Sequence, residues 1–281
     1  MSHSLKAEFL LDPEVVYLNH GSYGACPRPV FAAYQAWQRE LELHPVRFIG
    51  QRLPGLLTEA RGELGAYLGV TGDDVVYFAN PTTAVKMLCH SLELGPGDEI
   101  LTSNYEYPAM NGIWQYVAYR TGARYVHHPI PVPVPSAADT VEALWAGVNE
   151  RTRVIFCSHI AAFTALILPV AEICRRARAA GILTVVDGAH APGQIPLDLG
   201  TLGADVYIGA CHKWMCAPKG AAFLHVREDR QSGVRPLVIS HGATSPLAGR
   251  SRYLTEFDWM GTDDPTAVLS IGRAIEVMAS M

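Results

Sequence analysis

The chain of 281 residues carries little charge and has no strong excess of one sign. Only 17% of its residues are charged, and the formal net charge is −5. Nucleic-acid binding needs clustered Lys and Arg, and the one basic run, at 175–178, lies in a predicted helix that we interpret as a solvated face. The composition therefore indicates no nucleic-acid partner. With 49% hydrophobic residues, the chain can still bury a large core.

Long apolar runs and organised cysteines are also lacking. No segment reaches the roughly 20 apolar residues that cross a bilayer, and residues 1–9 contain no apolar signal-peptide core. The six cysteines form neither a zinc-like pattern nor a disulfide framework, and the eleven histidines lack ligand spacing. We therefore predict no metal site, no membrane partner and a soluble protein in the reducing cytoplasm.

Strand-like apolar runs alternate along the chain with amphipathic helical segments. The predicted strands are 75–79, 99–102, 123–127, 154–158, 183–187, 206–209 and 221–225. The predicted helices are 28–43, 54–68, 83–92, 109–121, 139–148 and 170–180. Continuous apolar strands are typical of sheets buried on both faces. The alternation predicts an α/β fold, with a mostly parallel seven-stranded sheet and helices on both faces.

The predicted organisation has one large domain at 17–265, preceded by a short N-terminal segment at 1–16. Prolines at 129, 131, 133 and 135 predict an extended surface connector, because proline cannot donate to a strand ladder. Residues 266–281 have a helical pattern, and then the chain stops. We expect either that this helix docks on the large domain or that it leads to a small C-terminal domain that is missing.

Asp187 and Lys213 are the residues that carry the most chemical information. Asp187 ends a predicted buried strand, and Lys213 follows another strand in the segment Cys-His-Lys-Trp at 211–214. An acid that pairs with a pyridinium nitrogen and a lysine that forms a Schiff base are the two groups that pyridoxal phosphate requires of a protein. Taken singly, Asp187 is also typical of a helix cap, and Lys219 is a nearby competitor for the lysine role.

Three further segments sit where strands end. Asn-Pro-Thr-Thr-Ala at 80–84 lies between a strand and a helix, where backbone N–H groups and threonine hydroxyls can bind phosphate. The alternative is that a threonine there is an ordinary helix N-cap. Tyr105 and Tyr107 follow the strand at 99–102 and either stack on a ring or pack on the next helix. The small polar loop at 19–24 permits close approach of a ligand, or is only a turn.

Together these segments resemble the class V aminotransferase family of fold-type I pyridoxal-phosphate enzymes, in particular its branch of isopenicillin N epimerases and C–S lyases. The resemblance runs from about residue 17 to 270. It is carried by Leu-Asn-His-Gly-Ser-Tyr-Gly at 18–24, Asn-Pro-Thr-Thr-Ala at 80–84, Glu-Tyr-Pro-Ala at 106–109, Asp-Gly-Ala-His-Ala-Pro-Gly at 187–193, His-Lys-Trp at 212–214, Ala-Pro-Lys-Gly at 217–220 and Gly-Thr at 261–262.

The resemblance implies a role for each matching residue around the cofactor ring. Lys213 would form the Schiff base, and Asp187 would pair with the pyridine nitrogen. His190 would approach the ring's 3-hydroxyl, where many relatives have glutamine. Tyr107 would stack on the ring, where cysteine desulfurases have histidine.

The resemblance also implies a phosphate site, a dimer and a substrate entrance. Thr82, the amides around Thr83, and His212 would hold the phosphate. Thr262 would reach the phosphate of the neighbouring subunit in a homodimer. The substrate would be an amino acid, a small molecule, and the residues near its entrance would be Asn19, His20, Gly21, Ser22 and Arg47.

Such an enzyme would use Lys213 to remove the Cα proton of the amino acid. The resulting carbanion leads to epimerisation, to loss of a β-substituent or to transamination, so a class V aminotransferase or cysteine desulfurase activity is the alternative. Epimerisation also needs a second proton carrier, for which Tyr107, Tyr105 and His20 are the candidates.

The chain departs from the family pattern at several positions. Ala210 stands where relatives have a polar residue, and Ala161, Ala162 and Phe163 replace a hydroxyl-rich segment. Relatives continue into a small C-terminal domain that carries an arginine for the substrate carboxylate. These departures favour a further alternative, a truncated family member that binds the cofactor but is catalytically impaired.

Overall fold

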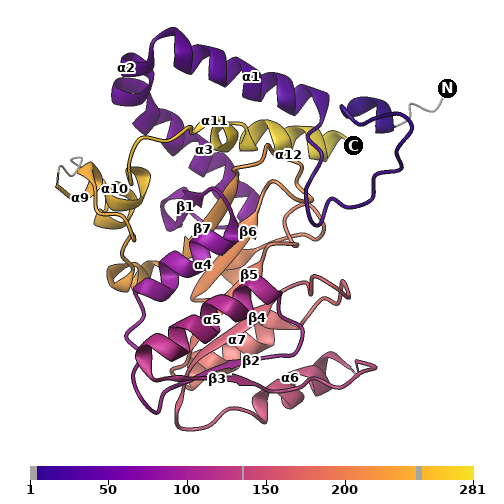
Figure 1. Ribbon diagram of the computed structural model, residues 1–281, viewed down its shortest axis with the longest axis vertical. Helices are drawn as coiled ribbons and strands as arrows, with labels where there is room; N and C mark the ends of the chain where they lie inside the picture. The colour runs from indigo at the N-terminus through magenta and orange to yellow at the C-terminus, as the bar shows by residue number, and fades with distance from the viewer. Residues whose placement is uncertain (1–4, 135, 245–248) are drawn as a thin grey trace.

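The computed structural model describes residues 5–134, 136–244 and 249–281. Its centre is one seven-stranded sheet with the order β1-β7-β6-β5-β4-β2-β3 (Figure 1). The strands are β1 Val75–Phe78, β2 Glu99–Thr102, β3 Arg124–His127, β4 Thr152–Ser158, β5 Leu183–Gly188, β6 Val206–Ala210 and β7 Ala222–Val226. Each lies where an apolar run predicted it, so the predicted α/β class and the strand number are confirmed.

Strand direction brings the functional segments to one edge of the sheet. Strands β2 to β6 pair in parallel, whereas β7 runs antiparallel to both β6 and β1. No helix separates β6 from β7, and a parallel pair requires such a crossover. Because β7 is antiparallel to both of its neighbours, β1 and β6 run in the same direction. The carboxyl ends of β1, β2, β4, β5 and β6 therefore share one edge, where open parallel sheets bind ligands.

Helices cover both faces of the sheet (Figure 1). They are α1 Arg28–Leu43, α2 Pro45–Arg47, α3 Leu53–Leu68, α4 Pro81–His90, α5 Pro108–Thr121, α6 Ala137–Trp145, α7 Val170–Ala179, α8 Leu199–Leu202, α9 His241–Thr244, α10 Arg252–Asp258, α11 Thr266–Leu269 and α12 Ile271–Ser280. Short 3₁₀ turns span Leu5–Glu8, Gly72–Asp74 and Glu228–Gly233, and a π turn spans Phe48–Arg52.

Two apolar cores lie on opposite faces of the sheet, because successive strand residues point in opposite directions. Val186 packs in the core that includes Leu64 of α3 and Ile173 of α7. Val185 packs in the other core, with Trp114 of α5 and Tyr253 of α10. The sheet is thus buried on both faces, which explains why its strands are continuous apolar runs.

Several predicted helix boundaries are wrong by a few residues, and local capping explains the shifts. The helix predicted at 83–92 begins at Pro81, because Asn80 caps it and proline suits the first turn. The helix predicted at 139–148 begins at Ala137 and ends at Trp145, because Ser136 and Asp139 form a capping box. Such caps lie outside the apolar pattern on which the prediction rests.

The C-terminal helical pattern folds as two short helices, α11 and α12, which divide at Ser270. The Ser270 hydroxyl donates to the carbonyl of Thr266, 2.8 Å away. Both helices pack on α1 and α3 (Figure 1). Of the two expectations for this segment, the structure places it on the large domain. The prediction of a missing C-terminal domain stays a prediction.

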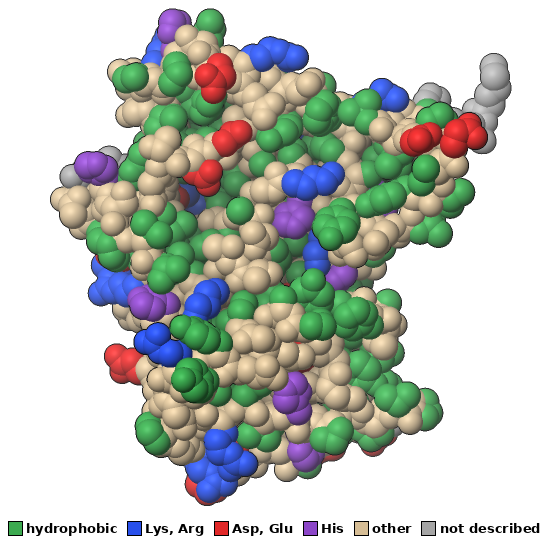
Figure 2. All heavy atoms as spheres, in the orientation of Figure 1, with side chains coloured by type: hydrophobic (Ala, Val, Ile, Leu, Met, Phe, Trp, Pro, Cys, Tyr) green, Lys and Arg blue, Asp and Glu red, His purple; other side chains and the backbone are tan. Residues whose placement is uncertain are grey.

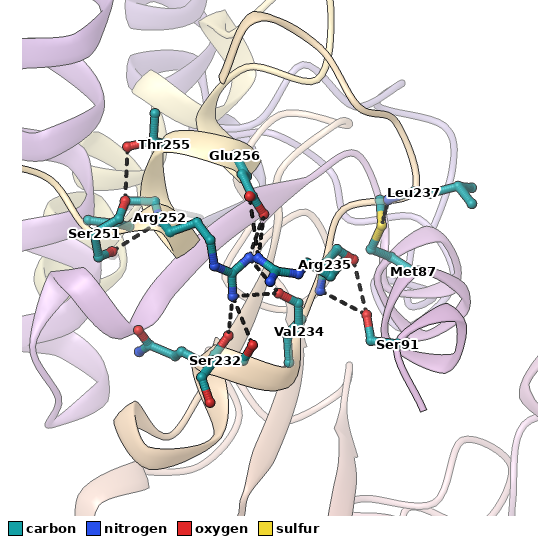
Figure 3. A network of polar contacts seen from close by, with 12 residues as sticks. Met87, Ser91, Ser232, Val234, Arg235, Leu237, Ser251, Arg252, Thr255 and Glu256 are labelled. Atoms are coloured by element: carbon teal, nitrogen blue, oxygen red, sulfur yellow. Dashed lines mark hydrogen bonds and ion pairs between the residues drawn. The ribbon is translucent and has the colours of Figure 1, made fainter. Parts of the chain in front are cut away.

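A polar network fixes α10 against the segment that follows β7 (Figure 3). The Arg252 guanidinium donates to the carbonyls of Gln231, Ser232 and Val234 and pairs with Glu256 at 2.6 Å. Arginine supplies several donors in one plane, so a single side chain can satisfy all these carbonyls. The network holds α10 over β1 on the face that carries α4 and α5.

Two further sequence predictions concern features that the fold touches only in part. The proline-rich connector at 129–134 contains no helix or strand, and its last residue, 135, lies outside the described residues. The predicted N-terminal segment is described from Leu5 onward, since residues 1–4 are also outside. Within the described ranges, no helix has the length and apolar character needed to cross a membrane.

Candidate active site

A cavity of about 280 Å³ opens at the carboxyl ends of the parallel strands. It collects side chains from widely separated segments of the chain. The lining residues are Gly21, Ser22, Tyr23, Asn80, Pro81, Thr82, Tyr107, Met110, Ser158, Ile160, Ala162, Asp187, Ala189, His190, His212 and Lys213. In the view of Figure 2, His side chains and Lys or Arg side chains gather near the middle of the molecule. Among the lining residues, Asp187 is acidic and His190, His212 and Lys213 are basic.

Asp187 is held at the end of β5, deep in the cavity. It is only 5% exposed, and its carboxylate accepts a hydrogen bond from the Ala189 N–H at 3.0 Å. Burial raises the pKa of Asp187, whereas the Ala189 N–H and the charge of Lys213 lower it. A buried carboxylate is costly unless it meets a positive or donating partner, so Asp187 is poised to pair with a protonated group in the cavity.

Lys213 lies in the turn between β6 and β7 and reaches into the same cavity. Its Nζ lies 3.2 Å from His190 Nε2 and 6.0 Å from the centre of the Tyr107 ring. Burial lowers the pKa of Lys213, and the charge of Asp187 opposes that shift. A lowered pKa raises the fraction of neutral amine, which is the nucleophilic form.

His190 lies between Lys213 and Trp214 and contacts both. Its Nδ1 accepts a hydrogen bond from Trp214 Nε1 at 3.2 Å. Burial, and to a smaller extent the charge of Lys213, lowers the pKa of His190 to about 4. The imidazole is therefore neutral at neutral pH and carries one proton, on one of its two nitrogens.

The two tyrosines that follow β2 have different surroundings. Tyr107 lines the cavity and is 42% exposed, whereas Tyr105 is 9% exposed and belongs to the core. Tyr105 is thus packed away from the cavity, and only Tyr107 has a ring available to a ligand. Met110, in the first turn of α5, lines the same cavity.

The start of α4 also contributes to the cavity. Thr82 lines the cavity, but Thr83 faces a neighbouring cavity that also includes Gly261. The Thr83 N–H and hydroxyl both donate to Asn80 Oδ1, at 2.9 and 3.0 Å. Asn80 is therefore the cap of α4, so the alternative of a threonine cap is wrong for this segment. His212 also faces the cavity, and its Nδ1 donates to the carbonyl of Ala221 at 2.9 Å.

Glycines let the N-terminal loop dock on the lysine turn. The Gly24 N–H donates to the His212 carbonyl at 3.0 Å. A Cβ added at Gly24 would overlap the carbonyl oxygens of His212 and Lys213. Gly193, with φ of 85°, also packs closely on the backbone of Trp214. The position of Lys213 therefore depends on two residues that have no side chain.

Replacement of Gly24 by alanine is expected to destabilise the protein by about 2 kcal/mol, because backbone must move to make room for the methyl group. The shift would also displace the turn that carries Lys213. Thermal unfolding measures the loss of stability. Gly62→Ala is the matched control. Gly62 is exposed in α3, and a Cβ added there would meet no neighbour, so alanine is expected to increase the stability by about 0.5–1 kcal/mol. Equal effects of the two substitutions would contradict the docking argument.

The structure brings most of the predicted site residues together but not all of them. Gly21, Ser22, Thr82, Tyr107, Asp187, His190, His212 and Lys213 line one cavity. The other predicted residues, namely Asn19, His20, Arg47, Thr83 and Thr262, do not line it. Asn19 instead caps the loop by accepting from the Ser22 N–H, and His20 stacks on Trp214 with ring centres 6.0 Å apart. Arg47 lies in α2, and Thr262 precedes α11; their predicted roles stay predictions.

Two residues near the cavity were missed in the sequence. Ser158 ends β4 directly beside Asp187 in the sheet register and lines the cavity. Its hydroxyl donates to the buried carboxyl of Glu106 at 2.7 Å. The position of Ser158 at a strand end was the available signal, whereas nothing in the local sequence marked Glu106 as buried.

The donor set of the cavity fits pyridoxal phosphate. A buried carboxylate, a neutral imidazole and an amine with a lowered pKa face one space, and a tyrosine ring borders it. These groups match the ring nitrogen, the 3-hydroxyl, the aldehyde and the flat face of that cofactor. Among the described residues, no three His, Cys, Asp or Glu side chains gather as a metal site.

Known proteins that resemble this chain belong to one family of enzymes. The Aminotransferase class-V family matches residues 17–281. Isopenicillin N epimerase of Amycolatopsis lactamdurans is 39% identical over 96% of this chain and 71% of its own length. The isopenicillin N epimerase of Streptomyces clavuligerus is 37% identical over 98% of this chain and 72% of its own length.

Solved structures of the C–S lyase C-DES have the same fold. One, with glycine covalently linked to the PLP cofactor, superposes with a TM-score of 0.87 at 24% identity, covering 99% of this chain and 74% of that chain. Another, the cystine C–S lyase with its product cysteine persulfide, gives a TM-score of 0.84 at 26% identity over 96% of this chain and 73% of that chain.

Proposed function

The chain belongs to the class V aminotransferase family, whose fold it shares, and we propose that it binds pyridoxal phosphate and acts at Cα or Cβ of an amino acid as an epimerase or C–S lyase. The observation that carries the proposal is the cavity that both Asp187 and Lys213 line, with His190 between the Lys213 amine and Trp214. Asp187 and His190 follow β5, whereas Lys213 follows β6, so the convergence of these groups is a property of the fold.

The residues in the cavity divide the cofactor between them. Lys213 would bind the aldehyde carbon, Asp187 the ring nitrogen and His190 the 3-hydroxyl. Tyr107 would cover the ring face. Thr82 and His212, which line the same cavity, would hold the phosphate. When bound, pyridoxal phosphate supplies an electron sink that stabilises negative charge at Cα of the amino acid.

Lys213 is the proton acceptor in this proposal. Its burial favours the neutral amine, which can take a proton from Cα. Asp187, buried at the strand tip and bound to the Ala189 N–H, would pair with the protonated ring nitrogen. For epimerisation a second group must return a proton to the other side of Cα. Of the three candidates, Tyr107 alone lines the cavity, since Tyr105 is in the core and His20 packs on Trp214.

We also propose a cytoplasmic homodimer. All six cysteines are free, which is typical of a reducing compartment. Thr262 lies outside the cavity of its own chain, as expected for a residue that serves the neighbouring subunit's phosphate site. Light scattering on the purified protein measures the mass, and a monomer would contradict this part of the proposal.

The experiment that tests the activity uses the purified chain incubated with pyridoxal phosphate and then desalted. A visible absorption band that survives desalting is expected. The protein is then given L-cysteine and L-cystine, and separately L- and D-amino acids without a β-leaving group. Pyruvate and ammonia release without loss of chirality supports the lyase, and loss of chirality without pyruvate supports the epimerase. A protein that stays colourless favours the impaired family member instead.

A further inference from the structure

Trp214 fixes which nitrogen of His190 carries the proton. Indole Nε1 is only a donor, and it points at His190 Nδ1 from 3.2 Å. The nitrogen at the receiving end must therefore be unprotonated. Since neutral imidazole carries one proton, that proton is on Nε2, the nitrogen that faces Lys213.

The same geometry determines the protonation state that Lys213 favours. His190 Nε2 and Lys213 Nζ are 3.2 Å apart. An ammonium group has donors and no acceptor, so it would oppose the Nε2 proton, donor against donor. A neutral amine has a lone pair and can accept that proton. The series of hydrogen bonds from Trp214 through His190 to Lys213 is complete only when the lysine is uncharged.

We propose that Trp214 is a positioning residue, which locks the His190 tautomer and thereby keeps Lys213 a neutral nucleophile that is ready to capture an aldehyde. The proposal rests on the proposed function for its purpose, but its physical content concerns the cofactor-free chain. The same locked proton on Nε2 would be available to an oxygen of a bound cofactor. Burial lowers the pKa of Lys213 in the same direction.

The loop at 19–24 packs against the Trp214 indole. His20 stacks on Trp214 at an interplanar angle of 27°, with ring centres 6.0 Å apart. Gly21 lies against the tryptophan–histidine pair, since a Cβ there would sit 3.1 Å from Trp214 Cζ2 and 3.2 Å from His190 Cε1. The N-terminal loop thus presses the donor onto its acceptor.

Other groups also face Lys213 and must be separated from the effect of Trp214. Asp187 attracts the charged form of the lysine, and burial together with the charge of Lys213 lowers the pKa of His212. The Tyr107 ring lies 6.0 Å from Nζ. Replacement of Trp214 by phenylalanine leaves all three in place and removes only the N–H donor together with part of the ring.

The first test reads the tautomer directly. The full chain, freed of cofactor and labelled with ¹⁵N-histidine, is studied by NMR, and the His190 signals are identified by their loss in His190→Gln. In the wild type, protonated Nε2 and unprotonated Nδ1 are expected at every pH at which the ring is neutral. In Trp214→Phe, the proton is expected to move to Nδ1 as Lys213 becomes charged. A wild-type ring protonated on Nδ1 would overturn the proposal.

The second test measures Lys213 itself. Its acylation by an amine-specific reagent is followed by mass spectrometry against pH, with Lys219 as internal reference. In Trp214→Phe, the apparent pKa of Lys213 is expected to rise by roughly one unit, so that acylation at fixed pH slows about tenfold. Trp145→Phe, at a half-buried tryptophan on α6, is the matched control and should leave the rate unchanged.

A double substitution shows whether the effect passes through the histidine. Glutamine at position 190 keeps a donor whatever the indole does, so Trp214→Phe should have no further effect on acylation in a His190→Gln background. An equal effect in both backgrounds, or no effect in either, overturns the proposal. All three measurements use cofactor-free protein. A colourless protein would therefore refute the proposed function without deciding the role of Trp214. Failure of the Trp214 tests would likewise leave the proposed function undecided.

Discussion

Lys213→Ala is expected to lower kcat for any amino-acid substrate by about 10⁴-fold or more, because it removes the group that would both bind the cofactor aldehyde and take the Cα proton. A positioned general base alone contributes up to about 10⁴-fold. Lys213 is the amine that lies in the cavity with Asp187. The visible absorption band of the protein mixed with pyridoxal phosphate should disappear in the same variant.

Lys219→Ala is the matched control for this prediction. Lys219 lies six positions on, after the same strand, but it is exposed and does not line the cavity. Its replacement should leave kcat within a few-fold of the wild type. Thermal unfolding of both variants checks that neither is misfolded; loss of the Lys213 amine should not destabilise the fold, since burial opposes its charge. Activity that survives in Lys213→Ala and vanishes in Lys219→Ala would reverse the assignment.

Addition of a small primary amine gives a sharper form of the same experiment. The substitution leaves space where the butylamine stem of Lys213 stood, and a small amine can enter it and accept a proton. Partial recovery of activity that grows with amine concentration, in Lys213→Ala only, would show that the missing function is proton transfer. No recovery, with the band still lost, would assign the larger share of the effect to cofactor attachment.

The fold could be predicted because its signals are local. Each strand is a continuous apolar run, and burial on both faces of the sheet requires such runs. Asp187 and Lys213 could be paired because each follows such a strand and the carboxyl ends of parallel strands meet at one edge. β6 and β5 are neighbours in the sheet, so the two residues converge without any long-range information.

The remaining parts of the site could not be predicted, since they depend on contacts between distant segments. Thr82 and Thr83 are adjacent and chemically alike, yet the Asn80 cap turns one toward the cavity and occupies the donors of the other. The hydrogen bond from Trp214 to His190 exists only once two turns meet. Glu106 stands between two tyrosines in a segment that has no apolar period, so its burial follows from tertiary packing alone.

Glu106 makes a second large effect testable, through the pH dependence of stability. Its carboxyl is 4% exposed and accepts hydrogen bonds from Ser103 and Ser158 at 2.6 and 2.7 Å. Burial raises the pKa of Glu106 from its usual 4.5 to about 7, and the nearby charge of Asp187 acts in the same direction, whereas the two hydroxyl donors lower it. The folded protein therefore holds a proton that the unfolded chain has released.

The sign of the effect follows from proton counting. Between pH 4.5 and about 7 the folded state binds more protons at Glu106 than the unfolded state, so this residue's contribution to stability falls as pH rises through that window. A shift of this size corresponds to about 3 kcal/mol at most. Glu106→Gln cannot ionise and keeps hydrogen-bonding atoms for both serines. It should be more stable than the wild type at pH 8 by about 2–3 kcal/mol, and close to it at pH 5.

Urea unfolding of the wild type and Glu106→Gln at pH 5 and pH 8 measures this difference. The difference in stability between the two proteins at each pH is the quantity that tests the prediction. Burial lowers the pKa values of His159, His190 and His225 to about 4, so these residues make stability rise with pH over part of the same range. Their contribution cancels when the variant is subtracted from the wild type. Glu93→Gln, at an exposed position, should reproduce the wild-type curve. If Glu106→Gln is instead less stable by the same amount at both pH values, Glu106 is a structural hydrogen-bond acceptor that stays ionised beside Asp187.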